Sequence, residues 1–97
     1  MSERWFVYVA RCADGTLYVG IARDVAARIA AHDEGRGARY TRGRGPLQVL
    51  ATRACRSKGN ALRVELALKR LTRREKQEAV ASPRLLAAVA RRAVRRA

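Results

Sequence analysis

The sequence predicts one α+β domain in which a small β-sheet, begun by an antiparallel hairpin, is followed by several helices. Two runs rich in aromatic and β-branched residues, at 5–12 and 17–21, lie on either side of the Asp14-Gly15 dipeptide. This arrangement predicts a tight hairpin, because the turn needs a positive φ that glycine supplies. A third such run at 47–55 predicts a third strand, which is enough for a sheet with one packed face. A chain of 97 residues is expected to form a single domain with a modest core.

Four helices are predicted after the hairpin, three of them from helix-capping signals. Asp24 is a favourable N-cap for the first helix, which Gly35 would end. Residues 72–75 form a capping box, and Ser82-Pro83 places a cap before a proline at the first helical position. The expected helices cover residues 25 to about 34, about 60 to 71, a segment that begins at the capping box, and 84 to about 96. Residues 82–97 would thus form a basic helical extension of a single domain, 1–97.

Charge is the most unusual property of the composition. Lysine and arginine number 22 against 8 acidic residues, which gives a formal net charge of +14 at pH 7. Such a charge on a short chain indicates a polyanionic partner, with nucleic acid the first candidate and an anionic membrane surface the second. The sequence has no apolar run of the roughly 20 residues that span a bilayer and no signal-peptide pattern at its start. A cytoplasmic protein without membrane attachment is therefore expected.

The chain has 2 cysteines and 1 histidine, too few for a disulfide framework or for a tetrahedral zinc site made of these residues. Cys12 and Cys55 are expected to be reduced thiols on strands, and a bridge between them is the alternative. No small-molecule cofactor is expected.

Two basic segments are candidates for nucleic-acid contacts. The glycine-rich segment 35–46 sets one tyrosine among four arginines, a combination of charge and stacking surface that single-strand binders use. The alternative for this segment is a solvated loop. A second basic cluster follows at 69–76. The residues predicted to contact nucleic acid are Arg36, Arg39, Tyr40, Arg42, Arg44, Lys69 and Arg73.

Glu65 is the acidic residue without an evident structural role. The other seven fit a turn, a helix cap, a helix end or the terminus, or have an arginine one helical turn away. A single carboxylate suits Mg²⁺, which keeps most of its waters and takes further ligands from substrate phosphates. The alternative is an ion pair between Glu65 and Lys69 at i and i+4.

Four other residues fall into two pairs by their spacing. Tyr8 and Tyr18 lie an even number of residues apart across a short turn, so both can project from the same side of the sheet. Their alternative role is that of core residues with hydroxyls at the edge. Arg28 and His32, at i and i+4, share one face of the first expected helix, and the alternative is that this face is simply solvated.

The order of these residues resembles the GIY-YIG nuclease superfamily over about residues 5–71. Phe6-Val7-Tyr8 stands in the place of the first motif and Tyr18-Val19-Gly20 in that of the second. Arg28, His32 and Glu65 then match the family's arginine, its histidine or tyrosine, and its metal-binding glutamate. This chain departs from the pattern in having phenylalanine for the glycine of the first motif and no asparagine after the glutamate, where many members carry one.

The resemblance implies a three-stranded antiparallel sheet flanked by helices, and hydrolysis of a DNA phosphodiester with Mg²⁺ (or Mn²⁺). It implies that Tyr8 is the general base or positions the water, that Arg28 grips the phosphate, and that Glu65 is the metal ligand. A phenol has an ordinary pKa near 10, so Tyr8 could act at neutral pH only if nearby cations favoured its phenolate. His32 and Tyr18 would orient the water or the phosphate. The glycine of the second motif would allow a close approach of the backbone to substrate or to the first helix.

Two functions follow. The first is a Mg²⁺-dependent endonuclease that acts on branched, flap or damaged DNA in repair or recombination. The alternative is a non-catalytic or weakly catalytic module on the same fold that binds DNA or RNA. In either case a partner protein could supply the specificity, since the expected phosphate contacts carry no sequence information.

Overall fold

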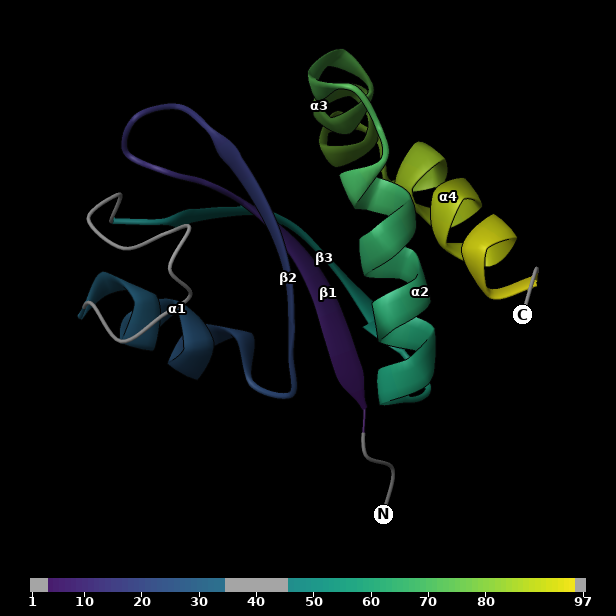
Figure 1. Cartoon of the computed structure of the whole chain (residues 1–97), viewed down its shortest axis with the longest axis horizontal. Helices are drawn as coiled ribbons and strands as arrows, with labels where there is room; N and C mark the ends of the chain where they lie inside the picture. Colours follow the sequence, from purple (N-terminus) through teal and green to yellow (C-terminus); the bar gives the residue numbers. More distant parts are fainter. Residues whose placement is uncertain (1–3, 35–45, 96–97) are drawn as a thin grey trace.

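A computed structural model describes residues 4–34 and 46–95. It has the predicted α+β architecture, in which a three-stranded sheet lies between one helix on one side and three on the other (Figure 1). The elements in chain order are β1 (Trp5–Arg11), β2 (Leu17–Ala22), α1 (Val25–Asp33), β3 (Gln48–Cys55), α2 (Lys58–Lys69), α3 (Arg73–Ala81) and α4 (Pro83–Arg95).

The sheet has the strand order β2-β1-β3, with both pairings antiparallel. The hairpin turn is closed by two backbone hydrogen bonds, from Cys12 N–H to the Thr16 carbonyl at 2.8 Å and from Gly15 N–H to the Cys12 carbonyl at 2.9 Å. Gly15 has a φ of 88°, which a residue with a side chain rarely adopts. The Asp14 carboxylate stiffens the turn by accepting hydrogen bonds from the backbone N–H and the hydroxyl of Thr16. The predicted hairpin is therefore confirmed.

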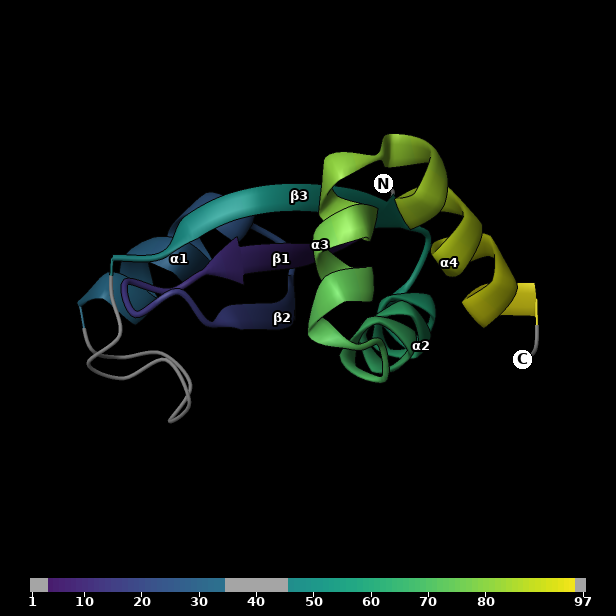
Figure 2. The ribbon, with the colours of Figure 1, turned by 90° about the horizontal axis from the view of Figure 1, so that it is seen from above.

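The two faces of the sheet carry separate cores because side chains alternate along a strand. On one face, β1 and β2 valines pack with apolar residues of α2 and α4: Val7, Val9, Val19, Ala61, Val64, Leu68, Leu86 and Ala90. On the other face lies a smaller cluster, which contains Tyr8, Ala10, Cys12, Ala22 and Leu47 and packs against Tyr18 and against Val25 and Ile29 of α1. Figure 2 shows α1 on one side of the twisted sheet and the other helices on the opposite side.

The helix ends largely follow the predicted caps, with one correction. The second helix, α2, begins at Lys58 rather than at Asn60, because Ser57 is its N-cap and accepts a hydrogen bond from Asn60 N–H at 3.1 Å. It also ends at Lys69, two residues earlier than expected. Thr72 and Glu75 form the predicted capping box at the start of α3.

The cysteines and the lengths of the helices agree with two further expectations, whereas a third expectation falls on residues outside the described ranges. Cys12 and Cys55 are both free thiols, as expected. Within residues 4–34 and 46–95, none of the helices combines the length and apolar character that crossing a bilayer requires. Five of the residues predicted to contact nucleic acid, and Gly35, lie outside the described residues: Arg36, Arg39, Tyr40, Arg42 and Arg44.

Candidate active site

Tyr8 projects from the central strand across its neighbour β2. Tyr8 and Gly20 are directly opposite in the antiparallel register, so their side-chain positions share one face. A Cβ atom at position 20 would lie 2.6 Å from the Tyr8 hydroxyl oxygen and 2.7 Å from its Cζ. The Tyr8 ring therefore occupies the space of the missing side chain. Gly20 thus makes room for this ring, while the close approach to substrate that the resemblance implies stays a prediction.

Tyr8, Tyr18 and His32 form one cluster on this face. The Tyr8 hydroxyl lies 3.2 Å from His32 Nε2, and this hydrogen bond is buried. The Tyr18 ring lies 6.2 Å from that of Tyr8 and 5.4 Å from the His32 ring, the latter edge to face. The two tyrosines thus project from the same side of the sheet, as their spacing predicted. His32 is only 2% exposed, so the alternative in which it lies on a solvated helix face is wrong for this residue.

The helix α1 brings both His32 and Arg28 to this site. Its N-cap Asp24 accepts a hydrogen bond from Ala27 N–H at 3.0 Å, which fixes the start of the helix. Arg28, one turn before His32, is exposed and lies in an open hollow of about 460 Å³ between α1 and the sheet. Its positive charge lowers the pKa of both Tyr8 and His32. Arg28 therefore acts electrostatically on both groups.

Glu65 approaches from α2. Its side chain is 18% exposed, and Glu65 Oε2 lies 3.4 Å from Lys69 Nζ, so the alternative i,i+4 ion pair does form. The negative charge of Glu65 nevertheless raises the pKa of Tyr8. Although α2 packs on the face opposite to α1, it also contacts β2, the edge strand that the Tyr8 ring crosses. The field of Glu65 therefore reaches the same phenol as that of Arg28.

Burial and neighbouring charge set the protonation states at neutral pH. The pKa of Tyr8 is raised to about 12, first by burial and then by Tyr18 and Glu65, against the opposing effect of Arg28. The sequence analysis required nearby cations to favour the phenolate of Tyr8 at neutral pH. Burial outweighs the charge of Arg28, so this condition is not met. Burial, followed by the Arg28 charge, lowers the pKa of His32, and the charge of Asp33 opposes this change. The pair is therefore a neutral phenol beside a neutral imidazole.

Glu65 is the residue of this site that could hold a divalent metal. Among the described residues, no group of three or more His, Cys, Asp or Glu side chains is placed to share an ion. Mg²⁺ is often bound by one or two carboxylates, with water and substrate phosphate as its other ligands. A partly exposed carboxylate with two hard oxygen donors fits that requirement. The ion pair with Lys69 would have to open for both oxygens to be used.

Two polar contacts near the site were not predicted from the sequence. Asp33 Oδ1 accepts a hydrogen bond from Leu47 N–H at 2.9 Å and so ties the end of α1 to the residue that precedes β3. Arg73 Nη2 donates to the Gly15 carbonyl at 2.7 Å and ties α3 to the hairpin turn. Arg73 was predicted only to contact nucleic acid, and this bond gives it a structural contact as well. No sequence pattern pointed to either bond, since each joins segments that are distant along the chain.

A three-stranded sheet with this tyrosine, histidine, arginine and glutamate arrangement agrees with the comparison to protein families. The family described as the GIY-YIG catalytic domain matches residues 4–78. The chain therefore belongs to the GIY-YIG nuclease superfamily. At the coarse level, this family membership implies nucleic-acid binding, and GIY-YIG nucleases generally use a divalent metal.

Within that superfamily, the chain is similar to proteins named UPF0213. It is 46% identical over 79 residues to one from Cronobacter sakazakii, covering 81% of this chain and 83% of the relative. It is 52% identical over 68 residues to one from Nitratidesulfovibrio vulgaris, covering 70% of this chain and 62% of that relative. The solution NMR structure of a UPF0213 protein from Bacillus halodurans matches with a TM-score of 0.53 and 46% identity, covering 80% of this chain and 83% of that one. These names state no activity, substrate or metal.

Proposed function

We propose that the protein is a Mg²⁺-dependent endonuclease that hydrolyses phosphodiester bonds in branched, flap or damaged DNA during repair or recombination. The observation that carries this proposal is the buried hydrogen bond between Tyr8 and His32. The charges of Arg28 and Glu65 both change the pKa of the Tyr8 phenol in this pair. Binding through phosphates alone carries no sequence information, which favours structure-directed cleavage. Mn²⁺ would serve in place of Mg²⁺.

In-line attack on a phosphodiester needs an activated water and neutralisation of charge on the phosphate. Arg28 is exposed at the site, and its guanidinium matches phosphate oxygens bidentately. Glu65 would hold the metal ion, which when bound supplies charge neutralisation at the leaving oxygen. Tyr18, in contact with both Tyr8 and His32, would keep these two groups in position.

The protonation states favour a relay in which Tyr8 is not the final base. With a pKa of about 12, the Tyr8 phenol cannot be a standing phenolate at neutral pH. It can accept the proton of the attacking water only as it donates its own proton to His32 Nε2. A neutral His32 with its proton on Nδ1 accepts a hydrogen bond from the Tyr8 hydroxyl at Nε2, and its lowered pKa keeps it neutral. In this proposal the proton passes from water to Tyr8 and then to His32.

The second candidate function is a nucleic-acid-binding module with little or no catalysis. The ion pair of Glu65 with Lys69 and the raised pKa of Tyr8 favour it, because each must be overcome before the site can work. The formal net charge of +14 serves binding equally well in both cases. The two candidates differ only in whether phosphodiester bonds are cut.

The test uses end-labelled branched, single-stranded and duplex DNA with and without Mg²⁺. Glu65→Ala and Tyr8→Phe are each expected to reduce single-turnover cleavage at least about a hundredfold, since each removes a group that acts on the reacting atoms. Glu78→Ala is the matched control, because Glu78 also forms an i,i+4 ion pair, with Arg74 at 3.8 Å, but on the exposed surface of α3. It should cleave like the wild type.

Cleavage that survives both Glu65→Ala and Tyr8→Phe would contradict the proposed site. Binding of the same DNA without cleavage, in Mg²⁺ and in Mn²⁺, would establish the second candidate. If Glu78→Ala lost as much cleavage activity as Glu65→Ala, the loss would come from removing a surface charge and not from removing a residue of the site.

A further inference from the structure

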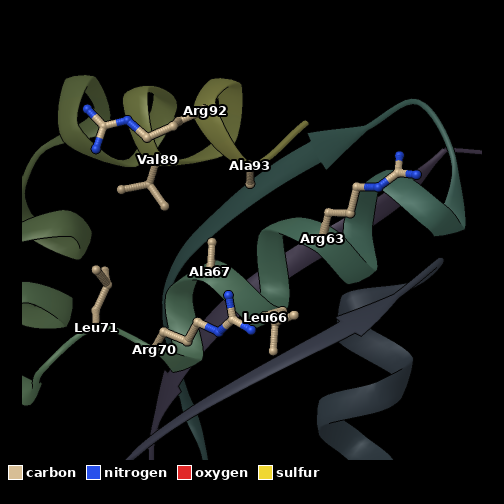
Figure 3. A pocket seen from close by; sticks show the side chains of 8 residues that line it. All are labelled: Arg63, Leu66, Ala67, Arg70, Leu71, Val89, Arg92 and Ala93. Carbon is tan, nitrogen blue, oxygen red and sulfur yellow. The ribbon is translucent and has the colours of Figure 1, made fainter. Parts of the chain in front are cut away.

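A second surface of possible function lies between α2 and α4, on the far side of the sheet from α1. It is a groove of about 350 Å³ whose floor is aliphatic. In Figure 3, Val89 and Ala93 project from α4 toward α2, while Ala67 and Leu71 face them. Leu66, on α2, is 50% exposed beside them. None of the residues that line this groove belongs to the five proposed for the nuclease site.

Three arginines frame the aliphatic floor. Arg63 comes from α2, Arg70 is the C-cap of α2 and Arg92 comes from α4, and all three are exposed. The groove has no acidic residue among its lining residues, so all the charged side chains that line it are positive. It has no aromatic residue either. An occupant must therefore bring both negative charge and aliphatic side chains.

These two requirements distinguish between the candidate occupants. Single-stranded nucleic acid is held in such sites largely by base stacking on aromatic rings, which this groove lacks. Duplex phosphates would contact the arginines but would leave the aliphatic floor uncovered. A second copy of the chain would bring a net charge of +14 against a positive rim. An amphipathic helix that is acidic on its flanks satisfies both requirements.

We propose that the groove between α2 and α4 is a docking site for an acidic amphipathic helix of a partner protein. Leucine-like side chains of that helix would cover Leu66, Ala67 and Val89, and its carboxylates would meet the three arginines. The α4 wall of the groove, Pro83–Arg95, lies beyond the residues 4–78 that match the catalytic-domain family. One wall of the groove therefore lies outside the range that matches the catalytic domain.

The experiment measures binding of a fluorescein-labelled peptide by anisotropy, with the full chain and no DNA present. The peptide carries leucine at the helical spacing i, i+3, i+4 and i+7 and glutamate at most other positions. A scrambled peptide of the same composition measures attraction by charge alone. Leu66→Glu and the milder Leu66→Ala test the floor, and Arg92→Ala tests the rim. Arg84→Ala is the matched control, because Arg84 is exposed on the same helix but does not line this groove.

The amphipathic peptide is expected to bind at least about tenfold more tightly than the scrambled one, and Leu66→Glu should remove that difference. Leu66→Ala and Arg92→Ala should each weaken binding several-fold, whereas Arg84→Ala should not. Thermal unfolding of every variant checks that it is folded. Equal binding of the two peptides, or binding that Leu66→Glu leaves unchanged, would overturn the proposal. So would a Leu66→Glu variant that loses affinity for single-stranded DNA but not for the peptide.

Discussion

The phenol ring of Tyr8 lies where any side chain at position 20 would have to be placed. A Cβ atom there would be 2.6 Å from the Tyr8 hydroxyl and 2.9 Å from a ring carbon of Tyr18. Both distances are well below van der Waals contact. Tyr8 is 1% exposed and bonded to His32, so its ring has little room to move aside. The glycine of the second motif is thus a packing requirement of the site itself.

Gly20→Ala is therefore expected to destabilise the protein by about 1–3 kcal/mol, as overpacking of a filled core does. It should also reduce cleavage, because the Tyr8–His32 contact must shift. Chemical denaturation and single-turnover cleavage measure the two effects. Gly59→Ala is the control, since its Cβ would meet only Ser57 Oγ at 3.8 Å, in the first turn of α2. That variant should be equally or more stable, by up to about 1 kcal/mol. Equal losses in both variants would contradict the role given to Gly20.

His32 should make stability depend on pH in a defined direction. Its pKa is lowered in the folded protein, whereas the unfolded chain binds the proton near the ordinary value of about 6.5. Between these two values the unfolded state binds more protons, so stability falls as the pH drops below about 6.5 and levels off below the folded pKa. His32 is the 1 histidine of the chain, which makes its contribution separable.

Unfolding free energies of the wild type and of His32→Gln, measured from about pH 5 to pH 7, test this expectation. The wild type should lose stability toward acid more steeply than His32→Gln, which has no imidazole to protonate. An NMR titration of the single imidazole gives the folded pKa directly. Parallel pH profiles for the two proteins, or an imidazole pKa at or above about 6.5, would contradict the burial and the Arg28 interaction assigned to His32.

For single residues, the sequence predicted correctly those features that depend only on neighbours along the chain. The even spacing of Tyr8 and Tyr18 across a turn was sufficient to place both on one face. The sequence left open whether His32 is solvated, because a helix face predicts which residues lie together but not whether the sheet covers them. The expectation that nearby cations would lower the pKa of Tyr8 considered only one of the causes that set this pKa. The charge of Arg28 does lower that pKa, but burial outweighs it, and burial is a property of the folded chain.

At the scale of elements, signals carried within one segment predicted most of the fold. The Asp-Gly turn and the capping box at Thr72 each act through bonds between residues two or three apart, and both are present. The start of α2 was predicted at about residue 60, two residues after the observed start at Lys58. Ser57, which caps α2, was the available signal, and a glycine in the first turn does not prevent a helix. Contacts that join elements, such as that of Asp33 with β3, leave no such signal.

Asp33 is expected to be a principal link between α1 and the sheet. Its carboxylate accepts the Leu47 N–H at 2.9 Å, and this N–H is in a partly buried position. Asp33→Ala would leave that donor without this partner and should cost about 1–3 kcal/mol in the free energy of unfolding. Asp33→Asn keeps an acceptor oxygen and should cost less. Because α1 carries Arg28 and His32, Asp33→Ala should also slow cleavage more than Asp33→Asn does. Equal stability of the two variants would show that the bond is of no consequence.

At the scale of the whole molecule, composition predicted the kind of partner but not where partners bind. A net charge of +14 follows from counting residues. The groove between α2 and α4 does not, because it depends on how two helices that are far apart in the sequence cross. The effect of the Glu65 charge on the pKa of Tyr8 is of the same kind, because it depends on how α2 packs against the sheet. Here the resemblance to a family, and not the pattern of residues alone, indicated that these positions belong together.

Nucleic acid is expected to be held mainly through its phosphates. If binding depends on phosphates neutralised by lysine and arginine, each neutralised phosphate releases condensed counterions, so affinity must fall steeply as salt rises. Anisotropy titrations of labelled single-stranded and branched DNA, at several salt concentrations, should give a log–log slope of about −0.7 to −0.9 per phosphate contact. Glu65→Ala, which removes a negative charge from the proposed site, should keep this slope while it abolishes cleavage. An affinity that hardly changes with salt would mean that the net charge of +14 does not serve nucleic-acid binding.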